Sequence, residues 1–323
     1  MNPTNKPSFK QVALSILIGL MGYVGAYMPI LLLLMPALLG FVLAAWGGVC
    51  FAFGAATAAA LTFGLLGLAD GLSVLAVFLP AAFIIGFCLK KKQPYRTAVI
   101  AASLALAVGY YCLICLPGVL AGEGPFKLME DFFLSMAKML ETQAAPLLEA
   151  GILLEEDLTL VADMTRSMSL MAAEMTVGSI GILGMGFGLL DVLIARMLAK
   201  RTLALRPMAP FYRWQLSKQY TVIAFLALGT ALLTYLFKLN NAGAVFVAAE
   251  CVVLLPVVLM GLCFLEFLSK VPGSGGNVRR ILTYVCVVLL IPYSFAFLLV
   301  IGFIDRAARI RRRVRLPEEK NDK

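Results

Sequence analysis

The chain has 323 residues, of which 62% are hydrophobic and only 14% charged, and it contains no histidine. Soluble domains carry about 25% charged residues, and their surface helices need polar faces that are missing here, so the composition excludes a soluble globular class. The net charge of +9 does not indicate a nucleic-acid partner, because the basic residues gather at the ends of apolar runs. That distribution is the positive-inside pattern of membrane proteins.

Nine apolar runs approach or exceed the length that crosses a bilayer, about 20 residues. They cover residues 12–28, 29–46, 48–69, 72–89, 97–120, 171–198, 220–238, 243–268 and 281–304. The sequence therefore predicts an all-α fold, a polytopic transmembrane helix bundle of about eight or nine spans in a single membrane domain, 1–323. The first run resembles a signal peptide, but no small-x-small cleavage site follows it, so we interpret it as an uncleaved span.

A stripe of small residues marks the third span. Its members are spaced by four residues: Gly48, Ala52, Ala56, Ala60 and Gly64. Small residues in a membrane let another helix approach closely. The stripe is therefore predicted to pack against a helix of this chain or of another protein.

Charge predicts the topology of the first six spans. With a cytoplasmic N-terminus, four spans return the chain to the cytoplasm at the lysines 90–92, and a fifth takes it out. The segment 121–170 is then external, and it is acidic, whereas the loop 199–219 is internal and basic. Apolar residues at helical spacing within 121–170 predict two amphipathic helices. These helices either lie on the membrane surface or cap the bundle, or else form a lid over a substrate.

The later spans carry the features that suggest a binding site. Gly184 and Gly188 form a G-x-x-x-G motif in the glycine-rich sixth span, which favours a kink or the close approach of a ligand. Glu250 lies about two turns into the run 243–268 and is the deepest acidic residue, and charges inside spans usually serve a function. Asp191 lies nearer a span end, where a charge reaches water more easily, so it carries a weaker signal.

The last run leaves two interpretations open. Pro292 lies near the middle of residues 281–304, and proline kinks or breaks a helix. A kinked span would leave the arginine-rich tail, 305–323, outside, against the positive-inside rule. A re-entrant hairpin would return the tail to the cytoplasm.

No motif indicates catalysis, a cofactor or a metal. The sequence contains no Walker loop, no G-x-S-x-G and no H-E-x-x-H, so the chain is not expected to be an enzyme. The seven cysteines lie in apolar runs and are interpreted as packing residues.

The basic loop carries the most distinctive motif, Pro210-Phe211-Tyr212-Arg213-Trp214-Gln215-Leu216. It resembles the P-F-x-x-W-x-L-P signature of the YybS-like family of bacterial membrane proteins. The residues 191–196, ending in Ala-Arg, resemble that family's N-x-x-x-A-R helix end, with aspartate in place of asparagine. Gly261 and the aromatic residues 264–267 resemble a later helix of the family.

This resemblance implies a relation in architecture to the substrate-binding subunits of energy-coupling-factor transporters and to membrane subunits of cell-shape machinery. Phe211, Arg213 and Trp214 then form either an interfacial anchor or a docking surface for a membrane or cytoplasmic partner. Two functions follow as hypotheses. The chain is a solute-binding subunit without an ATPase, with Glu250, Gly184 and Gly188 at its pocket, or it is a non-transporting scaffold in cell-envelope assembly. Its surroundings are the lipid bilayer of the cell membrane.

Overall fold

The computed structural model describes residues 7–27, 33–149, 155–200, 202–205, 210–216, 218–239, 241–271, 281, 284–285, 291–308 and 310–313. Within these ranges the fold is all-α, as predicted, and contains no strand. The chain forms two compact units, 1–206 and 207–323. The boundary falls inside the basic loop 199–219.

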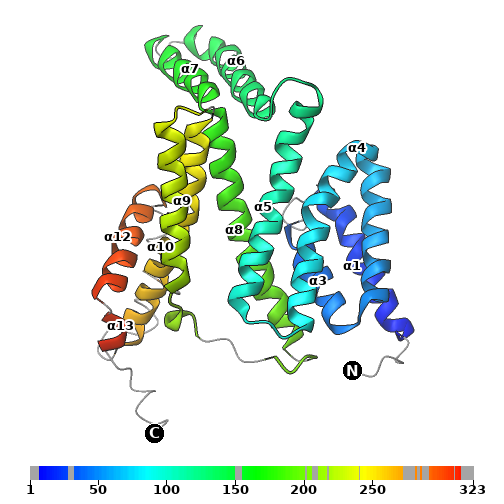
Figure 1. The fold of residues 1–323 in the computed structure, drawn as a ribbon. Coiled ribbons are helices and arrows are strands. Elements are labelled where there is room, and N and C mark those ends of the chain that lie inside the picture. Colours follow the sequence, from blue (N-terminus) through cyan, green and yellow to red (C-terminus); the bar gives the residue numbers. More distant parts are fainter. Residues whose placement is uncertain are drawn as a thin grey trace. The chain divides into compact units, whose positions relative to one another are not determined.

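Unit 1 begins with a group of packed helices (Figure 1). They are α1 (Phe9–Tyr27), α3 (Met35–Ala45), α4 (Gly48–Lys90), α5 (Tyr95–Leu120) and α8 (Ala172–Ala199). The long element α4 is two helices joined at Gly67, whose φ of 80° is a left-handed conformation that glycine adopts without strain. The two predicted spans 48–69 and 72–89 are therefore separate legs of one hairpin.

The segment 121–170 forms the two helices that its periodicity predicts, α6 (Lys127–Glu149) and α7 (Glu155–Leu170). They pack together through small side chains, among them Ala137 and Ala162. The Arg166 guanidinium bonds the Glu141 carboxylate across the pair at 2.5 Å. In unit 1 this pair lies at the opposite end from the start of α1 and the turn after Lys90, as the alternation of spans requires (Figure 1).

Unit 2 contains the short helix η1 (Phe211–Arg213) and the helices α9 (Lys218–Leu236), α10 (Ala242–Lys270), α12 (Ile291–Ala308) and α13 (Ile310–Arg313). The helices α10 and α12 run in the same direction: Gly261 meets Leu298, while Ile310 packs on the same aromatic cluster as Val271. The bounds of α12 make Pro292 its second described residue, and residues 286–290 before it lie outside the described ranges. The kinked-span and re-entrant interpretations of the run 281–304 both fall on those residues.

Length and composition identify the membrane-spanning candidates among the described residues. Four segments are long and apolar enough to cross a bilayer: Gly48–Leu65, Tyr95–Leu120, Ala172–Ala199 and Ala242–Lys270. Shorter apolar helices cover Phe9–Met21, Met35–Ala45, Val74–Lys90 and Tyr220–Leu236. These eight segments coincide with the first eight predicted runs.

Candidate functional site

The second predicted span, 29–46, contains a short helix that starts near the middle of unit 1. The helix α3 begins at Met35 with Pro36 in its first turn, and Leu34 before it supplies no side-chain cap. A proline ring clashes with the carbonyl four residues earlier, so a helix begins at such a residue more easily than it passes through it. Eleven residues of helix span about 17 Å, roughly half of the ~30 Å bilayer core. The first turn of α3, which contains Ala37, lies about this far from the end of the helix, and N–H groups of a first helical turn can bond a group outside the helix.

Asp191 of α8 lies against this helix start. Its side chain is 0% exposed, although it lies only two turns from the end of α8. The carboxylate faces the backbone N–H of Ala37 in the first turn of α3. The contact falls short of normal hydrogen-bond geometry, and neither carboxylate oxygen has a hydrogen-bond partner in the described part of the chain.

Two further buried polar atoms lie on α5, the helix that packs along α8. The hydroxyls of Ser103 and Tyr110 also lack a hydrogen-bond partner among the described residues. Among the described residues, five buried side-chain polar atoms have no hydrogen-bond partner, and four of them belong to Asp191, Ser103 and Tyr110. Unpaired buried polar groups are rare in native proteins and each needs an explanation, such as a functional role or a bound molecule. We call these three residues the polar centre.

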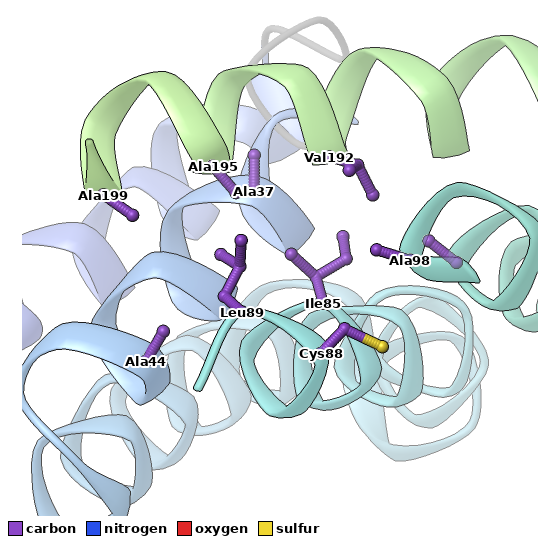
Figure 2. Close-up of a cluster of buried hydrophobic side chains, with 10 residues drawn as sticks. Ala37, Ala44, Ile85, Cys88, Leu89, Ala98, Val192, Ala195 and Ala199 are labelled. Carbon is purple, nitrogen blue, oxygen red and sulfur yellow. The ribbon is translucent and has the colours of Figure 1, made fainter. Parts of the chain in front are cut away.

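The surroundings of Asp191 are apolar and closely packed. Ala37 of α3, Ile85 of α4, and Val192 and Ala195 of α8 are all 0% exposed and share one core cluster (Figure 2). Burying an unpaired charge in such a medium is costly. The carboxylate of Asp191 therefore lies where a core would favour an apolar side chain.

The two glycines predicted to line a pocket bring α5 and α8 together. A Cβ atom added at Gly184 would lie 3.0 Å from the Ala107 Cβ, and one added at Gly188 would lie 2.6 Å from the Ser103 Cα. No larger residue fits at either position without moving a neighbouring backbone. Their observed surroundings are thus the α5–α8 contact beside the polar centre.

Glu250, the acidic residue ranked first from sequence, belongs to the third turn of α10 in unit 2 and is half-buried. Gly184 and Gly188, in contrast, belong to unit 1.

The loop motif of unit 2 docks on the ends of its own helices. Tyr212 and Trp214 are buried, whereas Arg213 is exposed and lies over the Tyr212 ring at 5.6 Å. Phe211 is half-buried and meets the Trp214 ring edge-on, with centroids 5.2 Å apart. Tyr212 also forms a cluster with Phe264 and Phe267 of α10. The residues that carry the family resemblance in this half of the chain thus lie together.

Arg311 of α13 connects this loop to α12 through an ion pair and hydrogen bonds. Its guanidinium pairs with the Asp305 carboxylate at 2.5 and 2.8 Å and donates to the carbonyls of Tyr212 at 2.9 Å and Trp214 at 2.7 Å. Both charged side chains are buried. The tail therefore starts at the same end of unit 2 as the loop.

The small-residue stripe of α4 faces outward. Gly48, Ala52, Ala56, Ala60 and Gly64 are all exposed. The face that packs on α1 and α3 is a second small-residue series, two residues out of step, which includes Gly54 and Ala58. A Cβ atom at Gly54 would lie 3.0 Å from the Ser15 carbonyl of α1.

From sequence alone, Asp191 carries a weaker signal than Glu250 because it lies nearer the end of its apolar run. The signal that identifies Asp191 is Pro36 in the second run, which starts a helix at the same depth. Arg311 offered no such signal, because it stands among many arginines in the tail.

Comparison with known proteins adds a family but no activity. A family model described as "Predicted membrane protein (DUF2232)" matches residues 12–306. No curated protein and no solved structure matches the chain.

Proposed function

We propose that this chain, which belongs to the DUF2232 family of predicted membrane proteins, is a solute-binding subunit of a membrane transporter. It carries no ATPase and is not itself an enzyme. The resemblance of its loop motif to the YybS-like family, and through it to energy-coupling-factor subunits, supports this assignment. An energising partner would dock at the loop surface that exposes Arg213.

The polar centre carries the proposal. A buried carboxylate without a partner, beside an unpaired hydroxyl and a mid-depth helix start, is an arrangement that membrane transport proteins use to hold solutes and ions. A protein that only needed to fold would gain stability by replacing Asp191 with an apolar residue. We therefore assign the binding role to Asp191 in preference to Glu250.

Two isosteric variants test this assignment. The full-length protein is purified from its native membrane, and mass spectrometry identifies the small molecules and proteins that accompany it. We expect a solute and an ATPase module with the wild type and with Glu250→Gln, and loss of the solute with Asp191→Asn, because the amide removes the charge but keeps the shape. If Asp191→Asn retains the solute and Glu250→Gln loses it, the solute binds at Glu250 of α10 and not at Asp191.

The exposed stripe of α4 favours a second candidate, a scaffold in cell-envelope assembly. A row of small residues that faces outward permits close approach by a helix of another protein. Envelope-synthesis proteins in the purified sample, in place of an ATPase, would support this function.

A matched pair of substitutions on α4 separates folding from partner binding. Ala58→Leu should lower the melting temperature, because Ala58 is 3% exposed and overpacking a core costs about 1–3 kcal/mol. Ala56→Leu, two residues earlier on the exposed face, should leave the melting temperature unchanged and should displace the envelope proteins if the stripe binds them. Equal destabilisation by both would mean that the stripe packs within the protein.

A further inference from the structure

We infer that the polar centre binds a small monovalent cation, a proton or Na⁺, on the Asp191 carboxylate. The inference rests on the proposed binding centre but not on the identity of any solute.

The first argument is charge. The described helix α3 contains no charged residue, and the titratable residues of α4 and α5 nearest the core cluster and the polar centre are Cys88 and Tyr110. On α8 itself, Arg196 stands five residues after Asp191, whereas side chains that meet on a helix are three or four residues apart. Its guanidinium is directed to the Gln93 carbonyl at 3.5 Å. Lys90, at the end of α4, is exposed. Within the described ranges, no cationic side chain therefore neutralises Asp191.

The second argument is donor chemistry and size. A carboxylate and a hydroxyl are hard oxygen ligands, which suit hard cations in preference to soft transition metals. One carboxylate supplies one negative charge, which matches a monovalent ion. The neighbouring residues Ala37, Val192 and Ala195 are completely buried, so a small ion at the carboxylate would be enclosed by packed side chains.

The third argument is reversibility. When the cation leaves, the carboxylate remains beside the positive end of α3, which stabilises a negative charge. The negative charge of the carboxylate is therefore compensated in two states. The cation compensates it when bound, and the N-terminal end of α3 compensates it when the cation has left. The Ala37 N–H lies within reach of the carboxylate in the second of these states.

Carbodiimide labelling tests the inference on the full-length protein in detergent. Dicyclohexylcarbodiimide reacts with a protonated carboxyl: the O–H adds across a C=N bond, and the O-acylisourea rearranges to a stable N-acylurea, which mass spectrometry locates. We expect labelling of Asp191 that falls several-fold with rising pH. Sodium chloride suppresses it further than choline chloride at equal ionic strength if Na⁺ is the ligand, and equal labelling in the two salts identifies the proton.

Melting temperature supplies the second readout. The wild type should respond to sodium or to pH, and Asp191→Asn should lose that response, while Glu250→Gln keeps it. Labelling of Asp191 that ignores both variables, or identical responses of the wild type and Asp191→Asn, would overturn the inference. Failure of solute binding in the purification experiment would leave these ion responses in place, so the two proposals fail separately.

Discussion

Replacing Arg311 with alanine lowers the stability of unit 2 by about 3–5 kcal/mol, the usual cost of breaking a buried ion pair from one side. The substitution leaves Asp305 as an uncompensated charge in a site where it is 4% exposed. It also removes the donor to the backbone carbonyls of Tyr212 and Trp214. Because these carbonyls belong to the docked loop, the loop should detach from α10 and α12.

Tryptophan fluorescence measures that detachment. The chain has two tryptophans, so Trp46→Phe leaves Trp214 as the only reporter of the loop. We expect a red-shifted emission and a lower melting temperature for Arg311→Ala. Replacing both Arg311 and Asp305 with apolar residues should recover much of the loss, because the unpaired charge is then absent.

Arg213→Ala serves as the control. Arg213 lies in the same loop but is exposed, and a stacked cation at such a site contributes about 0.5–1 kcal/mol. If Arg213→Ala and Arg311→Ala destabilise the protein equally, the buried pair does not hold the loop.

The parts of the fold that follow from sequence are those governed by local patterns. Apolar length predicted the eight described segments, and helical spacing predicted α6 and α7 within 121–170. Gly67 ends the first leg of α4 three residues before Asp70, where the apolar run is interrupted. Each of these features depends on residues within one or two turns of each other.

The parts that sequence could not supply depend on contacts between distant residues. Two small-residue series run along the first leg of α4, and spacing alone cannot tell that Ala58 faces inward and Ala56 outward. Asp191 owes its burial to α3, a helix more than a hundred residues earlier in the chain. The position of the tail was undecided because the direction of α12 follows from its packing on α10 and not from the apolar run 281–304.

Proline and glycine affect both the local structure and the contacts between distant helices. Each acts on the backbone at its own position, but it also determines how two helices meet. Pro36 stands in the first turn of α3, a helix that begins within the predicted run 29–46. Gly184 and Gly188 are predicted to line a pocket, and their missing side chains bring the backbones of α5 and α8 together at Ser103. The same residues therefore position the polar centre.

Gly261→Ala destabilises the protein by about 1–3 kcal/mol, the range for overpacking, although alanine is the better helix former. A Cβ atom at Gly261 would lie 2.8 Å from the Leu298 carbonyl carbon and 3.0 Å from its Cα, and closer still to its oxygen. These are backbone atoms of α12, so no rotamer change relieves the overlap. Gly302 of α12 lies at the same helix crossing. A Cβ atom added at Gly302 would lie 3.1 Å from the Gly261 nitrogen.

Gly229→Ala on α9 is the matched control, because it has the same helix propensity change and nothing lies within 4 Å of the added atom. We expect Gly229→Ala to leave the melting temperature unchanged or raise it slightly, and Gly261→Ala to lower it. A displaced α12 would carry Asp305 away from Arg311, so Gly261→Ala should also red-shift Trp214, 47 residues earlier in the chain. Unchanged stability and emission in Gly261→Ala would show that α10 and α12 do not meet at this crossing, and the position assigned to the tail would then lose its support.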